Sequence, residues 1–255
     1  MKIATWNVNS LKVRLPQVLA WLARERPEVL AVQEIKLTEE NYPFAEIAAA
    51  GYTSICSGQK SYNGVAVLSR QEALDPVTDL PGLDDPQRRV LALTVGDLRL
   101  LNLYVPNGGE VGSEKYAYKL EWLAQCRAWV EAQLERYPRL VVVGDLNVAP
   151  EDRDVHDPAL WAGQILCSEP ERERFRGLLA TGLSDAFRLF EQPEGSWSWW
   201  DYRMAAFRRN LGLRIDHVLV SEPLRQSCTS CRIDREPRGW ERPSDHAPVV
   251  AEFSS

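Results

Sequence analysis

Carboxylate and amide side chains directly follow three apolar runs of the chain. Asn7 and Asn9 follow the run KIATW, Glu34 ends VLAVQE, and Asp145 and Asn147 follow LVVVG. Residues i and i+2 of a strand face the same side, so each pair two positions apart is expected to point at one place. Oxygen ligands of this kind suit hard cations, Mg²⁺ or Mn²⁺, and not zinc. The pattern predicts metal-assisted hydrolysis of a phosphate ester, although an asparagine can also simply end a strand.

The segment PSDHAPV near the C-terminus sets Asp245 and His246 between two prolines. Proline fixes its own φ and biases the residue before it toward extended backbone. This predicts that Arg242 and Ala247 are both extended and that the Asp-His pair lies on a stiff bridge. The alternative is a plain turn before the last strand. The rest of the chain must supply partners for the pair if it is to do chemistry.

Composition and length set the general class of protein. The chain has 255 residues, of which 45% are apolar and 26% charged, as in ordinary globular proteins. No glycine- or serine-rich linker divides it, so we expect a single domain over residues 1–255. Five irregularly spaced cysteines, no membrane-length apolar run and no signal-like N-terminus predict a cytoplasmic protein without a membrane partner. The pair Cys228 and Cys231 is interpreted as ordinary thiols.

The charge distribution is uneven. The net charge of −6 argues against a nucleic-acid partner. However, residues 201–214 contain Arg203, Arg208, Arg209 and Arg214 against one acid, which predicts a local basic face. The alternative is that these arginines are solvated and serve only solubility.

Short apolar strands and amphipathic helices succeed one another along the chain. We expect strands over residues 2–8, 28–33, 52–57, 64–69, 89–95, 98–104, 140–143, 215–221 and 249–253, and helices over 15–24, 116–137 and 171–180. Because strands and helices do not alternate strictly, the pattern predicts an α+β fold in which helices cover two packed sheets.

Five sequence blocks occur in a fixed order, namely WNVNS, VQE, GDLN, LRIDHVLVS and PSDHAPV. They resemble the signature blocks of the exonuclease III family of DNA-repair nucleases, which belongs to the endonuclease/exonuclease/phosphatase superfamily together with DNase I-like enzymes. The resemblance runs from Met1 to Phe253, and SGQKSYNGVAVLSR, LYVPNG with KYAYKLEW, and WSWWDYR make it specific. It implies a four-layered α/β sandwich with two central mixed β-sheets flanked by helices.

The resemblance also implies an activity. We expect a Mg²⁺-dependent phosphodiesterase, with Mn²⁺ as a substitute and one or two ions bound. It would cleave double-stranded DNA on the 5′ side of abasic sites, or remove 3′-terminal nucleotides and blocking groups at 3′ ends and nicks, or have both activities. The products would carry 3′-OH ends. A monomer is expected.

Individual residues receive roles from the same resemblance. Glu34 and Asn7 are expected to hold the metal, with Asp245 assisting. Asp145 would orient and deprotonate the attacking water, with the amide of Asn147 beside it. An aspartate stands in some relatives where this chain has Asn9, so a second metal position would carry one negative charge fewer.

The phosphate itself is expected to meet a second group of residues. His246 would lie at the scissile phosphate, held in orientation by Asp216. Tyr104 and Asn107 would contact the phosphate or the leaving group. By strand alternation, His217 is expected to face the other way and pack in the interior.

Contacts to DNA are expected around WSWWDYR and the arginines after it. Lys60, Arg203 and Arg209 are the expected backbone contacts, with Lys115 and Lys119 as further candidates and Arg24 as an uninvolved surface residue. Trp199, Leu213 and Ile215 would line a pocket for a flipped-out, baseless sugar. His156 is placed on a loop bordering the DNA groove, and at least one tryptophan of the block is expected to pack in the core.

Two other functions remain open from the sequence. One is a phosphatase or lipid phosphodiesterase of the same superfamily, and the other is a catalytically inactive DNA-binding module. Nuclease assays with and without EDTA distinguish all three.

Overall fold

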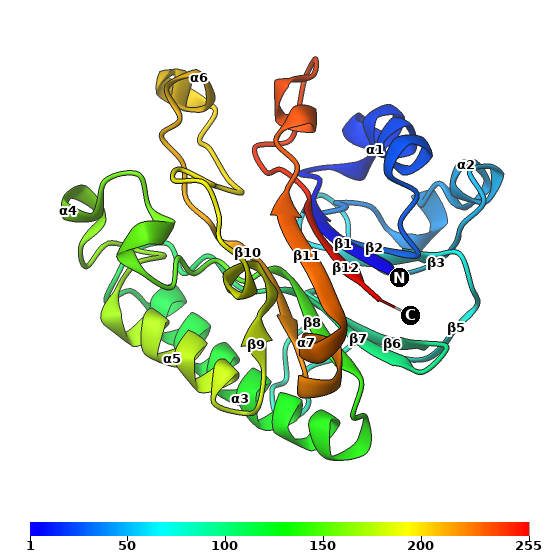
Figure 1. Ribbon diagram of the computed structural model, residues 1–255, viewed down its shortest axis with the longest axis horizontal. Helices are drawn as coiled ribbons and strands as arrows, with labels where there is room; N and C mark the ends of the chain where they lie inside the picture. The colour runs from blue at the N-terminus through cyan, green and yellow to red at the C-terminus, as the bar shows by residue number, and fades with distance from the viewer. Residues whose placement is uncertain (255) are drawn as a thin grey trace.

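Two six-stranded β-sheets pack face to face in the computed structural model, which describes residues 1–254 (Figure 1). The strand order of the first sheet is β11-β12-β1-β2-β4-β3. Its strands are β1 (Lys2–Asn7), β2 (Val29–Gln33), β3 (Thr53–Ser57), β4 (Val65–Ser69), β11 (Cys228–Ile233) and β12 (Val249–Phe253). The order of the second sheet is β5-β6-β7-β8-β10-β9. Its strands are β5 (Ala73–Val77), β6 (Val90–Val95), β7 (Leu98–Tyr104), β8 (Leu140–Asp145), β9 (Ser184–Asp185) and β10 (Asp216–Val220).

Each sheet contains one parallel pair of strands among antiparallel neighbours. β1 runs parallel to β2 in the first sheet, and β7 runs parallel to β8 in the second. A parallel pair needs a long crossover, which helix α1 (Leu11–Glu25) and helix α3 (Glu114–Arg136) provide. The carboxyl ends of the two pairs carry the polar residues singled out in the sequence.

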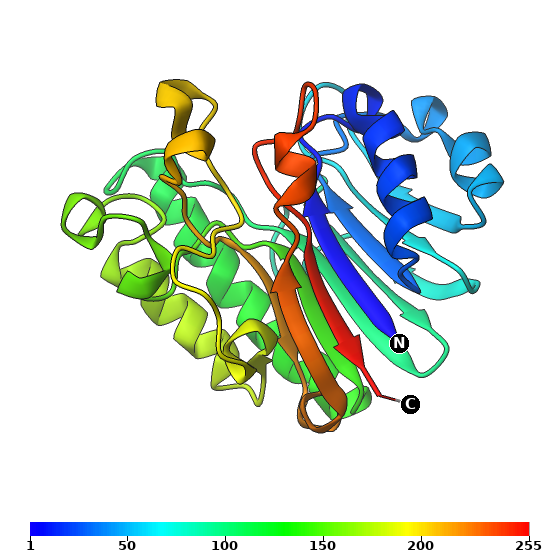
Figure 2. The ribbon, with the colours of Figure 1, turned by 45° about the horizontal axis from the view of Figure 1, so that its top comes forward.

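Helices cover the outer face of each sheet, which gives four layers (Figure 2). α1 and α2 (Phe44–Ala49) pack on the first sheet through a core that includes Trp6, Trp21 and Leu30. α3 and α5 (Glu169–Leu179) pack on the second through Trp122, Phe175 and their neighbours. The shorter helices are α4 (Pro158–Trp161), α6 (Ala206–Arg209) and α7 (Glu222–Ser227). The predicted four-layered α/β sandwich with mixed sheets is confirmed.

Some local predictions were wrong. α1 begins at Leu11 rather than at residue 15 and includes Pro16. β5, β9 and β11 were not expected, because their short sequences lack a clear apolar alternation, and β11 contains both Cys228 and Cys231. Arg242 has φ 50° instead of an extended conformation. The side chain of Gln17 bonds to the carbonyls of residues 241 and 242 and holds the tight turn in which Arg242 lies, against the preference imposed by the following proline.

A buried polar link joins the two sheets beneath the end that carries the polar residues. The amide nitrogen of Gln33 in β2 donates to Asn102 Oδ1 in β7 at 2.7 Å and to Thr5 Oγ1 at 2.8 Å. Asn102 in turn donates to the backbone carbonyls of Val32 and Ala66 in the first sheet. All three linking side chains are fully buried, so each bond is worth more than at the surface and the register between the sheets is fixed.

Gly144 allows β7 and β8 to approach closely just before Asp145. Its φ is 138°, and a Cβ built there would lie 1.9 Å from the carbonyl oxygen of Leu103. Only glycine fits this position, which accounts for the GD sequence at the end of β8. Among the helices of residues 1–254, none is both long enough and apolar enough to cross a bilayer.

Candidate active site

The carboxyl ends of the two parallel strand pairs meet around a cavity of about 350 Å³. Asn7 lies opposite Gln33 in the pairing of β1 with β2, and Tyr104 lies opposite Asp145 in that of β7 with β8. The cavity is lined by Glu34, Tyr104, Asn107, Asp145, Asn147, Trp161, Ile165, Leu166, Trp199, Asp201, Arg203, Ile215, Asp245 and His246. Ten residues of the sequence-derived set therefore share one cavity, although they come from distant parts of the chain.

The same turn ends β1 and β8. The side-chain oxygen of Asn7 accepts the backbone N–H of Asn9, and that of Asp145 accepts the backbone N–H of Asn147, both at 3.0 Å. Asn9 and Asn147 have φ of 43° and 50°, a left-handed conformation that asparagine tolerates. Strand alternation was therefore the wrong reason for expecting these pairs to act together, because each strand ends at the first member.

The two turns face each other across the sheets through Asn7. Its amide nitrogen donates to Glu34 Oε1 and to Asp145 Oδ2, both at 2.9 Å. The N–H of Asn9 can only donate, so it fixes the amide oxygen of Asn7 away from the carboxylates. In this arrangement Asn7 bridges two anionic groups as a donor. Direct metal ligation by its oxygen requires the amide to turn over.

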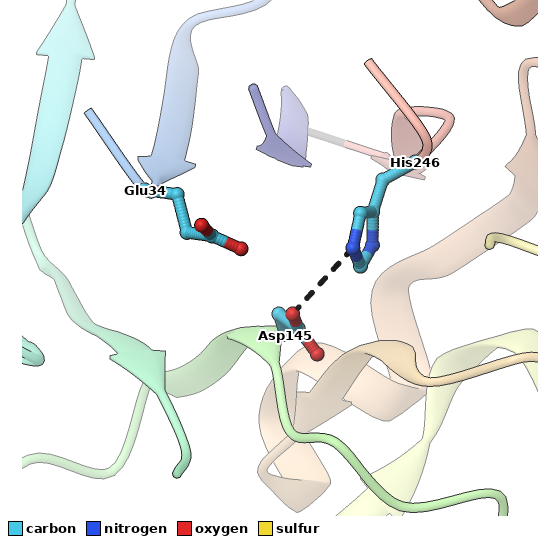
Figure 3. A group of neighbouring side chains, drawn as sticks. All are labelled: Glu34, Asp145 and His246. Carbon is cyan, nitrogen blue, oxygen red and sulfur yellow. Dashed lines mark ion pairs between the residues drawn. The ribbon is translucent and has the colours of Figure 1, made fainter. Parts of the chain in front are cut away.

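Glu34 lies directly after β2 with φ 52°, in a turn that aims its carboxylate at the cavity (Figure 3). Carboxylate or imidazole atoms of Glu34, Asp145 and His246 all lie within 4.8 Å of one another, a spacing that can hold a cation. Lys36 Nζ is 3.0 Å from Glu34 Oε2 and 2.6 Å from Asn9 Oδ1. This lysine was not singled out in the sequence, where nothing distinguishes it from a surface residue.

His246 bridges the two sheets through its imidazole. Nδ1 lies 2.8 Å from Asp216 Oδ2. Nε2 lies 3.7 Å from Asp145 Oδ2, the ion pair drawn as a dashed line in Figure 3. His246 precedes β12 in the first sheet, whereas both carboxylates belong to the second. The predicted approach of Asp216 to His246 is thus present in the structure.

Burial and charge shift the pKa values of this group. Desolvation raises the pKa of the buried Asp145 to about 7, although the neighbouring imidazole opposes the shift. Burial disfavours a charged imidazole, but Asp216 and Asp145 outweigh it and raise the pKa of His246 to about 10. Burial and the negative charges of Glu34 and Asp145 raise the pKa of Tyr104 well above its ordinary value. At neutral pH the site therefore contains an imidazolium, a neutral phenol and a carboxyl group near its titration point.

Hydroxyl and indole groups hold the His-Asp pair in place. Ser244 Oγ donates to the carbonyl of Asn7 at 2.6 Å and accepts the N–H of His246. Trp6 donates to the carbonyl of His246 at 3.1 Å. Ser198 Oγ accepts the N–H groups of residues 215 and 216, both at 3.0 Å. Sequence reasoning missed these residues, although both serines lie inside the blocks PSDHAPV and WSWW.

Asn107 and Asn147 lie side by side on the wall formed by the second sheet. Asn147 Nδ2 donates to the carbonyl of Val105 at 2.9 Å, and its Oδ1 lies 3.4 Å from Asn107 Nδ2. Asn147 is buried, whereas Asn107 is exposed to the cavity and the solvent. Amide N–H groups beside Asp145 and His246 can bind phosphate oxygens.

The apolar side of the cavity contains predicted and unpredicted residues. Trp199 and Ile215 line it, but Leu213 is fully buried behind them, where its backbone pairs with that of Trp199. The prediction of Leu213 as a lining residue was therefore wrong. Trp161, Ile165 and Leu166 complete the wall and were not expected, because nothing in their sequence differs from an ordinary loop.

Asp245 and the tryptophan block occupy the rim of the cavity. Both oxygens of Asp245 are engaged, one by Asn9 Nδ2 and the other by Trp199 Nε1, each at 3.0 Å. A role for Asp245 at the metal stays a prediction. Trp200 is fully buried, which confirms that at least one tryptophan of the block packs in the core, whereas its neighbour Trp199 lines the cavity.

The expected DNA contacts separate into two groups. Arg203 is exposed at the cavity and paired to Asp201, Arg209 is exposed in α6, and Lys60 is exposed on another loop. Lys119 and Arg214 are buried and paired with acids, so neither can contact DNA. Arg24, the expected uninvolved surface residue, bonds to Asp234 and Glu236 and stacks on Trp240, so its replacement would also disturb local packing.

The two remaining histidines lie apart from the reactive group. His217 is buried as predicted, with Nε2 2.9 Å from the carbonyl of Val148 and Nδ1 3.0 Å from Arg214 Nη1. Burial and Arg214 lower its pKa to about 4, so it is neutral. His156 is half-buried, and its Nδ1 lies 3.2 Å from the carbonyl of Gly212.

Comparison with known proteins assigns the chain to a family. Residues 4–246 match the Endonuclease/Exonuclease/phosphatase family. The chain belongs to this family. It is 34% identical to exodeoxyribonuclease III of Haemophilus influenzae, with 99% of this chain and 100% of the relative covered. It is 32% identical to an exodeoxyribonuclease of Bacillus subtilis, with 98% of each covered. It is therefore a hydrolase of the exodeoxyribonuclease III type.

Solved structures agree over the whole chain. The 3′ phosphatase NExo from Neisseria, bound to a product DNA hairpin, superposes with a TM-score of 0.98 at 47% identity, with 100% of both chains covered. An AP endonuclease from Archaeoglobus fulgidus gives a TM-score of 0.96 at 36% identity, again with 100% of both covered. The four-layered fold is therefore shared with this exonuclease-type phosphatase and this AP endonuclease.

Proposed function

We propose that this protein is a DNA-repair phosphodiesterase that cleaves DNA 5′ to abasic sites, removes nucleotides and blocking groups from 3′ ends, or does both. The observation that carries the proposal is the cluster of Asp216, His246, Asp145 and Glu34, in which an oriented imidazolium and two carboxylates surround one point of the cavity. Such a group suits in-line attack of water on a phosphodiester.

A divalent cation fits this donor set. Asp216 and a raised pKa keep His246 protonated, so the imidazole is not a ligand, and the carboxylate of Glu34 is the residue that would hold the cation. Hard oxygen donors favour Mg²⁺, with Mn²⁺ as a substitute. When bound, the cation would act as a Lewis acid that neutralises charge on the phosphate. Lys36 beside Glu34 adds a positive charge that opposes a second ion nearby.

The protein groups divide the remaining chemistry. Asp145 has a pKa near neutrality and accepts the proton of the attacking water. The imidazolium of His246 stabilises charge that develops on the phosphate oxygens, because Asp216 holds it ready before the reaction begins. The neutral phenol of Tyr104 and the amide of Asn107 donate to phosphate oxygens or to the leaving group.

The shape of the cavity supports a DNA substrate. Trp199, Trp161 and Ile215 form an apolar wall beside the reactive group, wide enough for a sugar without its base. The relatives named above act on nucleic acid by their names, and one is bound to a DNA hairpin. Exposed Lys60, Arg203 and Arg209 are the proposed contacts to the DNA backbone.

One experiment tests the proposal. A 5′-labelled duplex with a single abasic analogue is compared with an intact duplex and with one that carries a 3′-phosphate, each in Mg²⁺ and in EDTA. We expect cation-dependent incision at the abasic position, 3′-end trimming or phosphate release. The proposal fails if all three duplexes stay intact in Mg²⁺ while a phospholipid or inositol phosphate is hydrolysed.

We also propose that the enzyme is a monomeric, single-domain protein of the cytoplasm. Five free thiols, of which three are buried, support a reducing compartment. Light scattering at increasing concentration tests the monomer, and a mass that doubles contradicts it.

A further inference from the structure

Lys119 is a fully buried lysine behind the cavity wall. It lies in α3 and is 0% exposed. Its ammonium donates to the backbone carbonyl of Asn147 at 2.6 Å and to that of Asn107 at 3.1 Å. These are the two residues whose side-chain amides lie next to the reactive group. One cation therefore ties together two loops that come from β7 and β8.

Glu171 is the third partner of this lysine and is also 0% exposed. It forms an ion pair with Lys119 and accepts the N–H of Leu166 at 3.0 Å and that of Ser168 at 3.1 Å. Ser168 Oγ also donates to Glu171 at 2.6 Å and contacts the hydroxyl of Tyr116. Glu171 thereby fixes the segment from 165 to 168, which supplies the unpredicted apolar wall of the cavity.

The backbone around the pair is built to fit it. Gly108 has φ 92°, and a Cβ there would lie 2.9 Å from Lys119 Cδ and 3.0 Å from Ile165 Cδ1. Asn147 has φ 50° and Leu166 has φ 72°, a strained value for leucine. Left-handed residues persist only where surrounding contacts hold them, and here the carbonyl of Asn147 and the N–H of Leu166 are held by Lys119 and Glu171.

A stability role alone does not account for this arrangement. Replacing a buried ion pair by well-packed apolar residues is often neutral or stabilising, so stability alone does not call for an ion pair at this place. Burial lowers the pKa of Lys119 although the charge of Glu171 opposes the shift, so burying this ammonium is unfavourable. An apolar pair could fill the space, but it could not bind two carbonyls and two N–H groups in one geometry.

We propose that Lys119 and Glu171 are positioning residues that couple the phosphate-contacting amides of Asn107 and Asn147 to the apolar wall around Leu166. This inference rests on the proposed function, since it assigns these amides to a phosphate. The pair itself does not touch substrate. It sets the distance between the phosphate site and the wall that receives the sugar, so it acts on turnover rather than on DNA affinity.

The test replaces the pair in two steps and separates stability from turnover. Lys119→Met leaves the buried Glu171 without its cationic partner and is expected to lower the melting temperature and turnover. The double variant K119M/E171L removes both buried charges and should regain part of the melting temperature, since only the backbone groups that the pair bound are left unsatisfied. If the pair positions the amides, its kcat stays about 10- to 100-fold low, a loss typical of misplaced groups, while KM for the duplex changes less than threefold.

Arg99 supplies the matched control. It is a buried cation in β7, 2% exposed, and it bonds to Gln133 of α3 and to the carbonyl of Asp75, far from the cavity. Arg99→Met should lower the melting temperature and leave kcat unchanged below that temperature. A wild-type kcat in K119M/E171L, or an equal kcat loss in Arg99→Met, overturns the inference while the proposed function stands. No cleavage by the wild-type enzyme overturns both.

Discussion

β1 and β8 end in the same backbone turn, but the side chains in the two turns differ in their chemistry. In each, a side-chain oxygen accepts the N–H two residues on, and that second residue is a left-handed asparagine. The first residue is a neutral amide in β1 and a carboxylate in β8. Because the amide donates to the carboxylate at 2.9 Å, the two turns form a complementary pair.

The second members of the turns differ in their surroundings. Asn147 is buried and is held by Val105, Asn107 and the ammonium of Lys119. Asn9 is partly exposed, bonded to Lys36 and Asp245 at the rim. Comparing the two turns shows that the turn fixes where each side chain lies. Burial and neighbouring groups then decide whether that side chain takes up a proton, binds a phosphate or only holds the rim of the cavity together.

The largest loss of turnover is expected when the carboxylate of the β8 turn is replaced by an amide, as in the β1 turn. Asp145→Asn leaves the turn intact, since an amide oxygen also accepts the N–H of Asn147, but it removes the proposed base. We expect turnover to fall by about 10³-fold or more, as measured by single-turnover cleavage.

The same variant tests the electrostatics of the fold. The folded-state pKa of Asp145 is raised to about 7, so the group stabilises the fold at low pH and loses that contribution as the pH rises through about 7. Asp145→Asn should therefore not lower the melting temperature at pH 8. A lower melting temperature there means that the carboxylate is stabilised by its neighbours.

The second largest loss of turnover is expected when the contact between His246 and Asp216, which joins the two sheets, is removed. His246→Ala and Asp216→Ala should each lower turnover by about 10²- to 10⁴-fold. The double variant should be little worse than His246→Ala, because groups acting as a unit are not additive. Losses that multiply in the double variant give Asp216 a separate role.

A third variant places a carboxylate in the β1 turn, where the protein has an amide. Asn7→Asp places a carboxylate against Glu34 and Asp145 and removes the bridging donor, so like charges face each other. We expect turnover to fall about 100-fold at low Mg²⁺ and to recover in part at high Mg²⁺. Asn9→Asp is the matched change at the rim, where Lys36 can pair with it, and should cost about tenfold or less. Equal losses from both variants contradict the assigned difference.

The pH profile depends on the two sheets together. Cleavage needs Asp145 deprotonated and His246 protonated, so kcat/KM at limiting Mg²⁺ should rise through about pH 7 and fall through about pH 10. A nearby cation favours the carboxylate, so more Mg²⁺ should move the lower limb to lower pH. A profile that is flat from pH 6 to 8 at every Mg²⁺ concentration excludes Asp145 as the titrating base.

The smallest effect is expected at the rim. Arg209→Ala should flatten the dependence of log K on log salt by about one unit, measured in Ca²⁺ or EDTA. Arg127 is half-exposed on α3, paired only with Glu131, and Arg127→Ala is the control that should leave binding unchanged. The reverse result puts the DNA on another face.

The sequence predicted those parts of the fold and of the site that depend on short stretches of neighbouring residues. Apolar runs identified most strands, and the blocks around Glu34, Asp145 and His246 identified the reactive cluster. The sequence could not show that Lys119 turns inward to two carbonyls, or that Leu166 takes a strained φ at the cavity wall, because burial and partner choice arise from tertiary packing. Charge counting over residues 201–214 failed for the same reason at Arg214, which is buried against Asp154 and Asp185.

The link from His246 to Asp216 has a consequence for how the enzyme fails under heat. Glu34, Asn7 and His246 belong to one sheet, and Asp145, Asp216 and Tyr104 to the other. Neither sheet alone holds a working half of the site, and the bonds between them are short and directional. Inactivation should therefore coincide with separation of the sheets, so a loss of cleavage on warming reports the moment at which the two halves of the site come apart.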